Sequence, residues 1–293
     1  MYLASFEING EQNWGFVEPK LGLLCPSKVW LGEDAPKTLL EFIRLYHDEI
    51  SSLPRPKMND RWLKVENLHI AAPVPKLVRN VFCVGKNYQD HVSEMAKVGH
   101  STQTQISHPH FFTKATNTIA SPYSKIYLHP QITNQVDYEA ELAVVIGKRG
   151  INIPENKAMD YVFGYTILND LTARDLQRNH VQWFKGKSLD GFCPMGPWIA
   201  TKDEIGYPVE LEIQSWVNGE LRQHSNTREM IFSIPELVSI LSQGMTLEPG
   251  DILATGTPSG VGMGFEPPRL LKPGDVVRIE IEKIGYIENE MYV

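Results

Sequence analysis

Cysteine is scarce in this chain of 293 residues, and its three copies are widely spaced. Cys25, Cys83 and Cys193 form no C-x-x-C pair. An odd number of widely spaced cysteines predicts neither a disulfide framework nor a cysteine-based zinc site. Cys83 and Cys193 lie in apolar stretches, where we expect a thiol to pack as a small apolar side chain. The cytoplasm, which is reducing, is the simplest expectation for the compartment.

Long apolar runs and basic runs are missing as well. A bilayer span needs about 20 consecutive apolar residues. No such run occurs, and the N-terminus lacks the basic start and apolar core of a signal peptide. The formal net charge of −7, without clustered lysine and arginine, argues against binding to a phosphate backbone. We therefore expect neither a membrane nor a nucleic acid as a partner. The glycine patterns also give no support to a Rossmann dehydrogenase or a kinase.

The chain does contain enough apolar sequence for a sizeable core, with 42% apolar and 22% charged residues. Residues 1–70 predict a small β-rich N-terminal domain with one helix in Thr38–Leu53, where apolar residues recur at helical spacing. Residues 71–293 predict a larger domain of α+β class that is mainly β, with a rolled or barrel-like sheet system. Its expected strands cover residues 78–85, 108–115, 139–147, 162–170, 193–200, 209–219, 250–256 and 275–285.

Local signals place two helices and a hairpin in the larger domain. Ser233 is a good N-cap residue, and Glu236 three positions later completes the pattern of a capping box. Apolar residues then recur at helical spacing until Gly244, which we expect to end the helix. A second helix is expected over residues 156–165, and Asn218-Gly219 predicts a hairpin turn.

Alternating acids raise the question of a metal site. In the segment Val136–Gly147, Asp137, Glu139 and Glu141 are two residues apart, so a strand would place them on one face. Asp170 ends a second apolar strand. Carboxylates without a nearby Cys or His form a hard oxygen site that suits Mg²⁺ or Mn²⁺, and Ca²⁺ less strictly. The alternative is a solvent-facing strand edge, and spacing alone favours it.

A histidine and a glutamate follow the expected strand that ends at Gly85. His91 and Glu94 are three residues apart in a helical turn that we expect to begin near Tyr88, so they are neighbours on one face. A glutamate beside a histidine can orient the imidazole and support it as a general base. The alternative is a surface helix with an incidental pair, and this pattern alone favours the surface helix.

The segment 169–198 is dense in charged and polar side chains between two expected strands. Lys187 is a candidate for contact with a substrate carboxylate. Arg174 and Asp175 are expected to form a structural ion pair, and His180 is expected at the surface. Further on, residues 252–264 lead from a strand into a glycine-rich bend. Such bends offer backbone N–H groups and hydroxyls to an anion, although ordinary turns share the pattern.

Five motifs stand in one order from about Val78 to Glu282, which is most of the chain. They read GKNYQDH, DYEAELAVVIG, GYTILNDLTARDLQ, KGKSLD and MIFSIPELVSILSQGMTLEPGDILATGTPSGVG. Each motif is moderately specific, and five in order are highly specific. Together they resemble the fumarylacetoacetate hydrolase (FAH) family. The resemblance implies a mixed β-roll as the core of the larger domain and assembly as a homodimer.

The resemblance also implies roles for the acids and the dyad. Glu139, Glu141 and Asp170 match the family's ligands for a divalent metal, Mg²⁺ or Mn²⁺. His91 and Glu94 match a catalytic pair on a segment that closes over the site as a lid. The family's larger eukaryotic hydrolases carry an extra metal-binding aspartate far upstream. No secure counterpart stands here, which indicates the shorter three-carboxylate subgroup.

Four further residues are candidates near the substrate. Lys187 matches a catalytic lysine near the metal and the substrate, Gln177 a substrate-facing glutamine, and Thr257 a threonine of the substrate loop. Arg174 is placed with them as a candidate for substrate binding. Asp137 precedes the metal-binding pair, but no ligand role carries over to it.

The implied function is metal-dependent cleavage of a C–C bond in a small 2-oxo acid, through a metal-stabilised enolate. The reaction is oxaloacetate decarboxylation, acylpyruvate hydrolysis or both. In hydrolysis, His91 held by Glu94 would activate the attacking water. In decarboxylation, the pair would order the lid and help to protonate the enolate. Two alternatives stay open: an isomerase of the 2-hydroxyhepta-2,4-diene-1,7-dioate type from aromatic degradation, and a metal-binding scaffold or regulatory protein with a protein partner.

Overall fold

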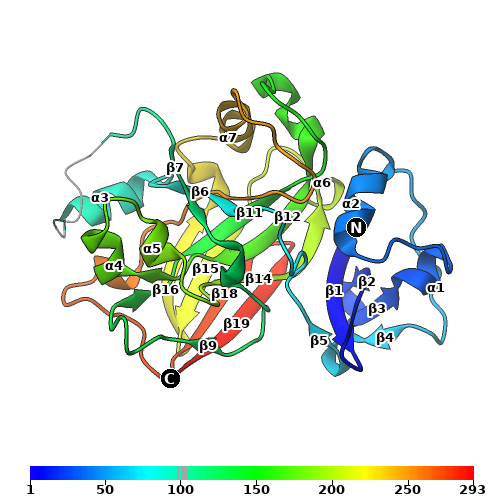
Figure 1. Ribbon diagram of the computed structural model, residues 1–293, viewed down its shortest axis with the longest axis horizontal. Coiled ribbons are helices and arrows are strands. Elements are labelled where there is room, and N and C mark those ends of the chain that lie inside the picture. Colours follow the sequence, from blue (N-terminus) through cyan, green and yellow to red (C-terminus); the bar gives the residue numbers. More distant parts are fainter. Residues whose placement is uncertain (98, 100–104) are drawn as a thin grey trace.

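The computed structural model describes residues 1–97, 99 and 105–293, which form a mixed α+β structure (Figure 1). The helices are α1 (Ser27–Leu31), α2 (Leu39–Tyr46), α3 (Gln89–Lys97), α4 (Arg174–Asn179), α5 (Phe184–Lys187), α6 (Lys202–Ile205) and α7 (Ile234–Leu241). Short 3₁₀ helices cover Pro19–Leu21, His47–Glu49, Val65–Asn67, Thr116–Thr118, Glu155–Tyr161, Thr227–Glu229 and Gly262–Gly264.

The strands group into three sheets in the described part of the chain. Their bounds are β1 (Tyr2–Ile8), β2 (Glu11–Glu18), β3 (Leu23–Pro26), β4 (Leu63–Lys64), β5 (His69–Ile70), β6 (Val81–Gly85), β7 (His110–Lys114), β8 (Ile119–Ala120), β9 (Ile126–Tyr127), β10 (Val136–Asp137), β11 (Ala140–Ile146), β12 (Val162–Asn169), β13 (Thr172–Ala173), β14 (Cys193–Thr201), β15 (Glu212–Val217), β16 (Glu220–Asn226), β17 (Ile252–Ala254), β18 (Val276–Ile281) and β19 (Gly285–Tyr292).

The largest sheet has twelve strands, with the main path β4-β3-β2-β1-β14-β12-β11-β17-β6-β7. A five-stranded sheet has the order β16-β15-β18-β19-β9, and β10 pairs with β13. The expected α+β class is confirmed, but the sheets of the described residues stay open and none closes into a barrel. Every residue of β11 and β12 is buried. The centre of the large sheet is therefore held between two apolar layers.

The N-terminal strands continue the large sheet, because β1 pairs with β14 and places Tyr2 opposite Ala200. One apolar cluster joins Trp14 and Phe42 from this part to Phe163 of β12. Figure 1 shows β1–β3 with α1 and α2 at one end of the molecule and α3, α4 and α5 at the other. The domain boundary near residue 70 stays a prediction. Among the described residues, no helix combines the length and the apolar character needed to cross a membrane.

Most of the expected elements are present. Each of the eight strands expected in the larger domain contains an observed strand. The hairpin turn is confirmed, because Asn218 and Gly219 have φ values of 54° and 78° between β15 and β16. Helix α7 begins after Ser233, whose hydroxyl accepts a hydrogen bond from the Glu236 N–H at 3.4 Å. All three cysteines are buried, and burial raises the pKa of the Cys83 thiol.

Two expected elements differ from the observed ones. Residues 156–165 were expected to be helical, but a 3₁₀ helix ends at Tyr161 and strand β12 follows at once. The apolar residues after Tyr161 pair with β11 and β14, and this pairing overrides the local helical pattern. The segment Val136–Gly147, which the argument about the acids treats as one strand, forms two strands, β10 and β11, which pair with different partners.

Candidate active site

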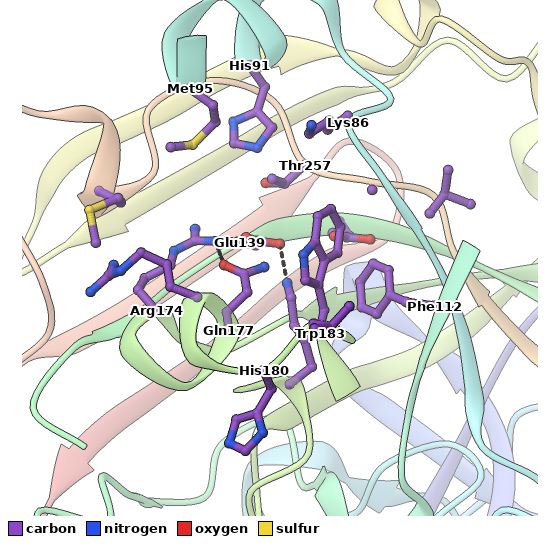
Figure 2. Close-up of a pocket in the computed structure, with 17 residues that line it drawn as sticks. Lys86, His91, Met95, Phe112, Glu139, Arg174, Gln177, His180, Trp183 and Thr257 are labelled. Carbon is purple, nitrogen blue, oxygen red and sulfur yellow. Dashed lines mark hydrogen bonds and ion pairs between the residues drawn. The ribbon is translucent and has the colours of Figure 1, made fainter. Parts of the chain in front are cut away.

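A cavity of about 330 Å³ lies where the ends of several strands meet the helices α3, α4 and α5 (Figure 2). Its walls come from segments far apart in the sequence. Its lining includes Val84, Gly85, Lys86, His91, Met95, Phe112, Glu139, Glu141, Arg174, Gln177, Arg178, His180, Val181, Trp183, Lys187, Thr257 and Met263. All nine sequence-predicted site residues lie at this cavity. Seven of them line it, namely His91, Glu139, Glu141, Arg174, Gln177, Lys187 and Thr257, while Glu94 pairs with His91 and Asp170 pairs with Lys187.

The carboxylates converge because β11 and β12 are antiparallel neighbours. The start of β11 lies beside the end of β12, with Glu141 opposite Leu168. The Asp170 N–H donates to the Glu139 carbonyl at 2.9 Å, which joins the start of β11 to the end of β12. Ligand atoms of Glu139, Glu141 and Asp170 all lie within 4.8 Å of one another, and all three residues are buried. The predicted juxtaposition of these acids is therefore confirmed.

Three buried cations surround these acids. Lys187 Nζ lies 2.7 Å from Glu139 Oε2 and 2.6 Å from Asp170 Oδ2. Lys114 Nζ lies 2.7 Å from Asp170 Oδ1, and Arg174 Nη1 lies 2.8 Å from Glu139 Oε1. No basic side chain of the described residues comes within ion-pair distance of Glu141, which accepts a hydrogen bond from the Gly256 N–H at 2.8 Å.

The pKa values follow from this arrangement. Burial on its own would raise the pKa of Glu139, but Lys187 and Arg174 hold it at about 2. Burial raises the pKa of Glu141 well above its ordinary value, and the charges of Asp170 and Glu139 raise it further. The pKa of Lys187 is raised although burial opposes this, because Asp170 and Glu139 favour the charged ammonium.

The residues present fit a divalent cation. Glu139, Glu141 and Asp170 offer only carboxylate oxygens, which Mg²⁺ and Mn²⁺ prefer over softer ligands. Glu141 is buried beside two other acids without a cation of its own, and burying such a charge is costly unless it is paired. A divalent cation would supply the partner that Glu141 lacks.

The predicted dyad is also in place. His91 Nδ1 lies 3.1 Å from Glu94 Oε2 on helix α3, and His91 faces the cavity (Figure 2). The other oxygen of Glu94 accepts a hydrogen bond from the Gly260 N–H at 2.8 Å. Glu94 thus joins helix α3 to the glycine-rich loop. Residues 98 and 100–104, which follow the dyad in the segment expected to close over the site as a lid, lie outside the described residues.

The prediction that Arg174 forms an ion pair with Asp175 is wrong. Arg174 turns inward, where Asp137 and Glu139 offer buried charges that need a partner. Asp175 instead accepts hydrogen bonds from the Thr133 hydroxyl at 2.6 Å and from the backbone at the start of α4. Arg174 remains on the cavity wall, as its assignment to substrate binding requires.

Two predicted substrate residues are held by neighbours in the cavity wall. Gln177 Oε1 accepts a hydrogen bond from Arg174 Nη1 at 3.1 Å. The Thr257 hydroxyl accepts one from Gln223 Nε2 at 2.7 Å. His180 is exposed, as expected, and lies at the cavity (Figure 2). Gln177 and Thr257 both line the cavity although they come from two distant segments.

The glycine-rich loop binds the protein's own carboxylates. Its backbone N–H groups were expected to suit an anionic ligand. In the structure, the N–H groups of Gly256, Gly260 and Gly262 donate to Glu141, Glu94 and Asp137, respectively. The loop is therefore fixed by the acids of the site, and its Thr257 hydroxyl faces the cavity.

Sequence reasoning missed two features of the site. Lys114 is fully buried at the end of β7, where a charged residue closes an apolar strand as Asp170 does for β12. Trp183 lies against Gly85, where a Cβ would come within 2.4 Å of the Trp183 ring. Its ring also contacts Phe112 edge-on at 5.3 Å between centroids. A charged strand end could have indicated Lys114, but no local signal marks Trp183.

A buried site of oxygen ligands for a divalent cation, with a His–Glu dyad beside it, defines a metal-dependent enzyme. A family model described as fumarylacetoacetate (FAA) hydrolase C-terminal matches residues 80–292. The chain belongs to this family. Oxaloacetate tautomerase YisK of Bacillus subtilis (strain 168) is 48% identical to it over 243 residues, which cover 83% of this chain and 79% of that protein.

Two solved structures are similar over the whole chain. Fumarylacetoacetate hydrolase (EaFAH) from psychrophilic Exiguobacterium antarcticum has a TM-score of 0.83 at 40% identity, covering 100% of this chain and 99% of that one. Maleylpyruvate hydrolase from Sphingobium sp. SYK-6, solved with manganese(II) and pyruvate, has a TM-score of 0.75 at 28% identity, with the same coverage. Together with the carboxylates, these relatives support a metal-dependent enzyme that processes 2-oxo acids.

Proposed function

We propose that this chain cleaves a C–C bond in a small 2-oxo acid, as an oxaloacetate decarboxylase, an acylpyruvate hydrolase or both. The observation that carries the proposal is the convergence of three buried carboxylates at a cavity that His91 also lines. Mg²⁺ and Mn²⁺ are the cations that these ligands suit. The names of the relatives point to oxaloacetate and to pyruvate-containing substrates.

The side chains of the site have distinct tasks in this proposal. Glu139, Glu141 and Asp170 would hold a divalent cation, which would supply Lewis acidity for the reaction of a 2-oxo acid. When the C3–C4 bond breaks, its electron pair moves from C3 toward the C2 oxygen. The positive charges of Lys187 and Arg174 lie beside this centre and stabilise the negative charge that develops.

The dyad supplies proton transfer. A carboxylate only accepts hydrogen bonds, so the contact between Glu94 and His91 Nδ1 requires the proton on Nδ1. His91 Nε2 is then left as the acceptor that takes a proton from a water, which attacks C4 of an acylpyruvate. In decarboxylation no water attack is needed, and His91 would instead help to protonate C3 of the product enolate.

A second candidate is the keto–enol interconversion of oxaloacetate, favoured by the 48% identical relative named oxaloacetate tautomerase. In that reaction the C3–H bond breaks rather than the C3–C4 bond, and the electron pair again moves toward the C2 oxygen. His91 would carry the proton to and from C3. An isomerase of 2-hydroxyhepta-2,4-diene-1,7-dioate and a metal-binding scaffold remain alternatives from the sequence.

The first experiment follows oxaloacetate and acetylpyruvate with metal-depleted protein, before and after addition of Mg²⁺ or Mn²⁺. Pyruvate formation measures cleavage, and enol absorbance measures tautomerisation. Glu139→Ala is expected to remove both activities, whereas Glu33→Ala, at an exposed surface carboxylate, is expected to leave them unchanged. If the enol of oxaloacetate is turned over but no pyruvate forms, the activity is tautomerisation and not C–C cleavage. Isomerisation of the hydroxydienoate without turnover of either 2-oxo acid would sink the proposal.

We further propose that the enzyme is a cytoplasmic homodimer, on the basis of the family resemblance. Light scattering after size-exclusion chromatography is expected to give twice the chain mass of 33.2 kDa. A scaffold role is tested in cells: a phenotype that persists in a Glu139→Ala variant without bound metal would show a function beyond catalysis.

A further inference from the structure

Asp137 is a fully buried acid beside the site. Its side chain forms an ion pair and also accepts hydrogen bonds from two backbone N–H groups of the glycine-rich loop. Its Oδ2 lies 2.9 Å from Arg174 Nε and 2.8 Å from Arg174 Nη2. Its two oxygens also accept hydrogen bonds from the Gly262 N–H at 2.7 Å and the Met263 N–H at 3.0 Å. Asp137 therefore connects helix α4 to the glycine-rich loop.

Both ends of this connection lead to the cavity. The loop carries Thr257 into the cavity wall a few residues before Gly262. Arg174 reaches the cavity from the other side and contacts Glu139 and Gln177 with Nη1 (Figure 2). Without Asp137, neither the loop nor the guanidinium would keep this anchor.

Every nitrogen of the Arg174 guanidinium is held by a neighbouring side chain. Nε and Nη2 lie 2.9 Å and 2.8 Å from Asp137 Oδ2, and Nη1 contacts Glu139 and Gln177. The guanidinium also lines the cavity, where its positive charge suits a ligand carboxylate. Asp137 therefore sets the position from which Arg174 presents this charge.

We infer that Asp137 is a positioning residue for the substrate side of the cavity, where it aims Arg174 and fixes the loop that carries Thr257. The inference rests on the proposed function, because it treats Arg174 and Thr257 as groups that bind a 2-oxo acid. The metal ligands have anchors that do not involve Asp137: Gly256 holds Glu141, two lysines hold Asp170, and Lys187 holds Glu139, which also pairs with Arg174. Asp137 thus acts more on the organic anion than on the cation.

The charges around the cavity agree with this division. Arg174, Lys187 and Lys114 face Asp137, Glu139, Glu141 and Asp170, so four acids meet three cations. Asp137 offsets the charge of Arg174, which would otherwise be free to pair fully with Glu139. If Asp137 lost its negative charge, Glu139 would attract the Arg174 guanidinium more strongly and draw it away from a substrate carboxylate.

The test compares Asp137→Asn with Asp251→Asn in the full-length protein. Asp251 is also buried, pairs with Arg79 and accepts a backbone N–H, but neither residue lines the cavity. Titration calorimetry measures Mn²⁺ binding alone and then oxalate binding at saturating Mn²⁺. Asp137→Asn is expected to weaken oxalate binding about tenfold, as for a lost hydrogen bond to a charged group, with a smaller change in Mn²⁺ affinity. Asp251→Asn is expected to bind both as the wild type does.

Three results of the oxalate and Mn²⁺ titrations would contradict the inference. Equal oxalate affinity in Asp137→Asn and Asp251→Asn would overturn the inference, since a merely structural ion pair gives that result. An equal loss of Mn²⁺ and oxalate affinity in Asp137→Asn would overturn it too, because Asp137 would then act on the metal ligands. Wild-type protein that binds neither oxalate nor any 2-oxo acid with Mn²⁺ would overturn the proposed function together with the inference.

A second variant keeps the test open if Asp137→Asn does not fold. In Gly262→Ala, the added Cβ would lie 2.6 Å from Asp137 Oδ1 and 2.5 Å from the Arg269 carbonyl, so the loop must shift. The variant leaves every charge in place. We expect it to weaken oxalate binding while Mn²⁺ binding persists, and wild-type oxalate affinity in this variant would contradict the inference.

Discussion

Glu94 and Gly260 are joined by a hydrogen bond of 2.8 Å, in which the backbone N–H of the loop donates to a side chain of helix α3. The same carboxylate orients His91 with its second oxygen. The position of α3 over the cavity and the orientation of the imidazole therefore depend on one side chain. Gly264 preserves this geometry, because a Cβ there would lie 2.3 Å from the Glu94 carboxylate.

Glu94→Gln is expected to separate hydrolysis from decarboxylation. The amide oxygen can still accept from Gly260, but the amide N–H₂ would face His91 Nδ1 and place the imidazole proton on Nε2. His91 then loses its function as a base. Acetylpyruvate hydrolysis is expected to fall about 100-fold, and oxaloacetate decarboxylation much less. Steady-state kinetics with both substrates measure the difference, and an equal loss for both would contradict the assigned roles.

Glu141→Gln is expected to abolish metal binding and to stabilise the metal-free protein as the pH rises. Burial, with Asp170 and Glu139, raises the pKa of Glu141, so the folded metal-free protein holds a proton that the unfolded chain releases. The stability from this proton is full below the unfolded pKa, about 4.3, and is lost as pH rises through the folded pKa. Glutamine is neutral throughout and avoids this loss.

Thermal unfolding of wild type and Glu141→Gln between acid and alkaline pH, with a chelator, tests this expectation. The wild type should lose stability relative to the variant as pH rises. With Mn²⁺ added, only the wild type should gain stability, because Mn²⁺ binds the ionised carboxylate. Curves that run in parallel across the pH range would show that Glu141 does not titrate as expected.

The sequence could predict those parts of the site that depend on local spacing. Strand periodicity placed Glu139 and Glu141 on one face, and Asp170 ended an apolar strand, and the structure brings the ligand atoms of all three within 4.8 Å. Their assignment as metal ligands came from the family resemblance, because spacing alone favoured a solvent-facing strand edge. The contact between His91 and Glu94 followed from helical spacing in the same way. Capping at Ser233 was equally local.

The contacts that depend on distant segments were not predictable. Asp175 is the nearest acid to Arg174 in the sequence, yet Arg174 pairs with Asp137 and Glu139 because folding buries all three. The glycine-rich loop offered N–H groups, but its partners lie more than 100 residues away, as for Gly256 and Glu141. Local patterns contain no information about such partners, because sheet pairing decides which segments meet.

Trp183→Ala is expected to relax the size limit on the substrate. The Trp183 ring lies between Gly85 and Phe112 at the cavity wall, so its removal opens space beside the bound 2-oxo acid. The ratio of kcat/KM for a bulky acylpyruvate to that for acetylpyruvate should rise about tenfold, the scale of one or two methylene groups in a pocket. Trp30→Ala, in the N-terminal aromatic cluster, is the control. An unchanged ratio would show that Trp183 does not limit substrate size.

Lys114→Met is expected to make the protein less stable and more dependent on metal. Lys114 Nζ is fully buried at 2.7 Å from Asp170 Oδ1, and loss of one partner of such a pair costs about 3–5 kcal/mol. The methionine also removes a positive charge that repels a cation at Glu139, Glu141 and Asp170. Saturating Mn²⁺ should therefore raise the unfolding temperature of the variant more than that of the wild type.

Lys125→Met, which removes an exposed pair with Glu290, is the control and should change stability by only about 0–1 kcal/mol and leave the metal response unaltered. An equal response to Mn²⁺ in Lys114→Met and wild type would show that Lys114 does not influence the cation, and that its pairing with Asp170 serves the fold alone.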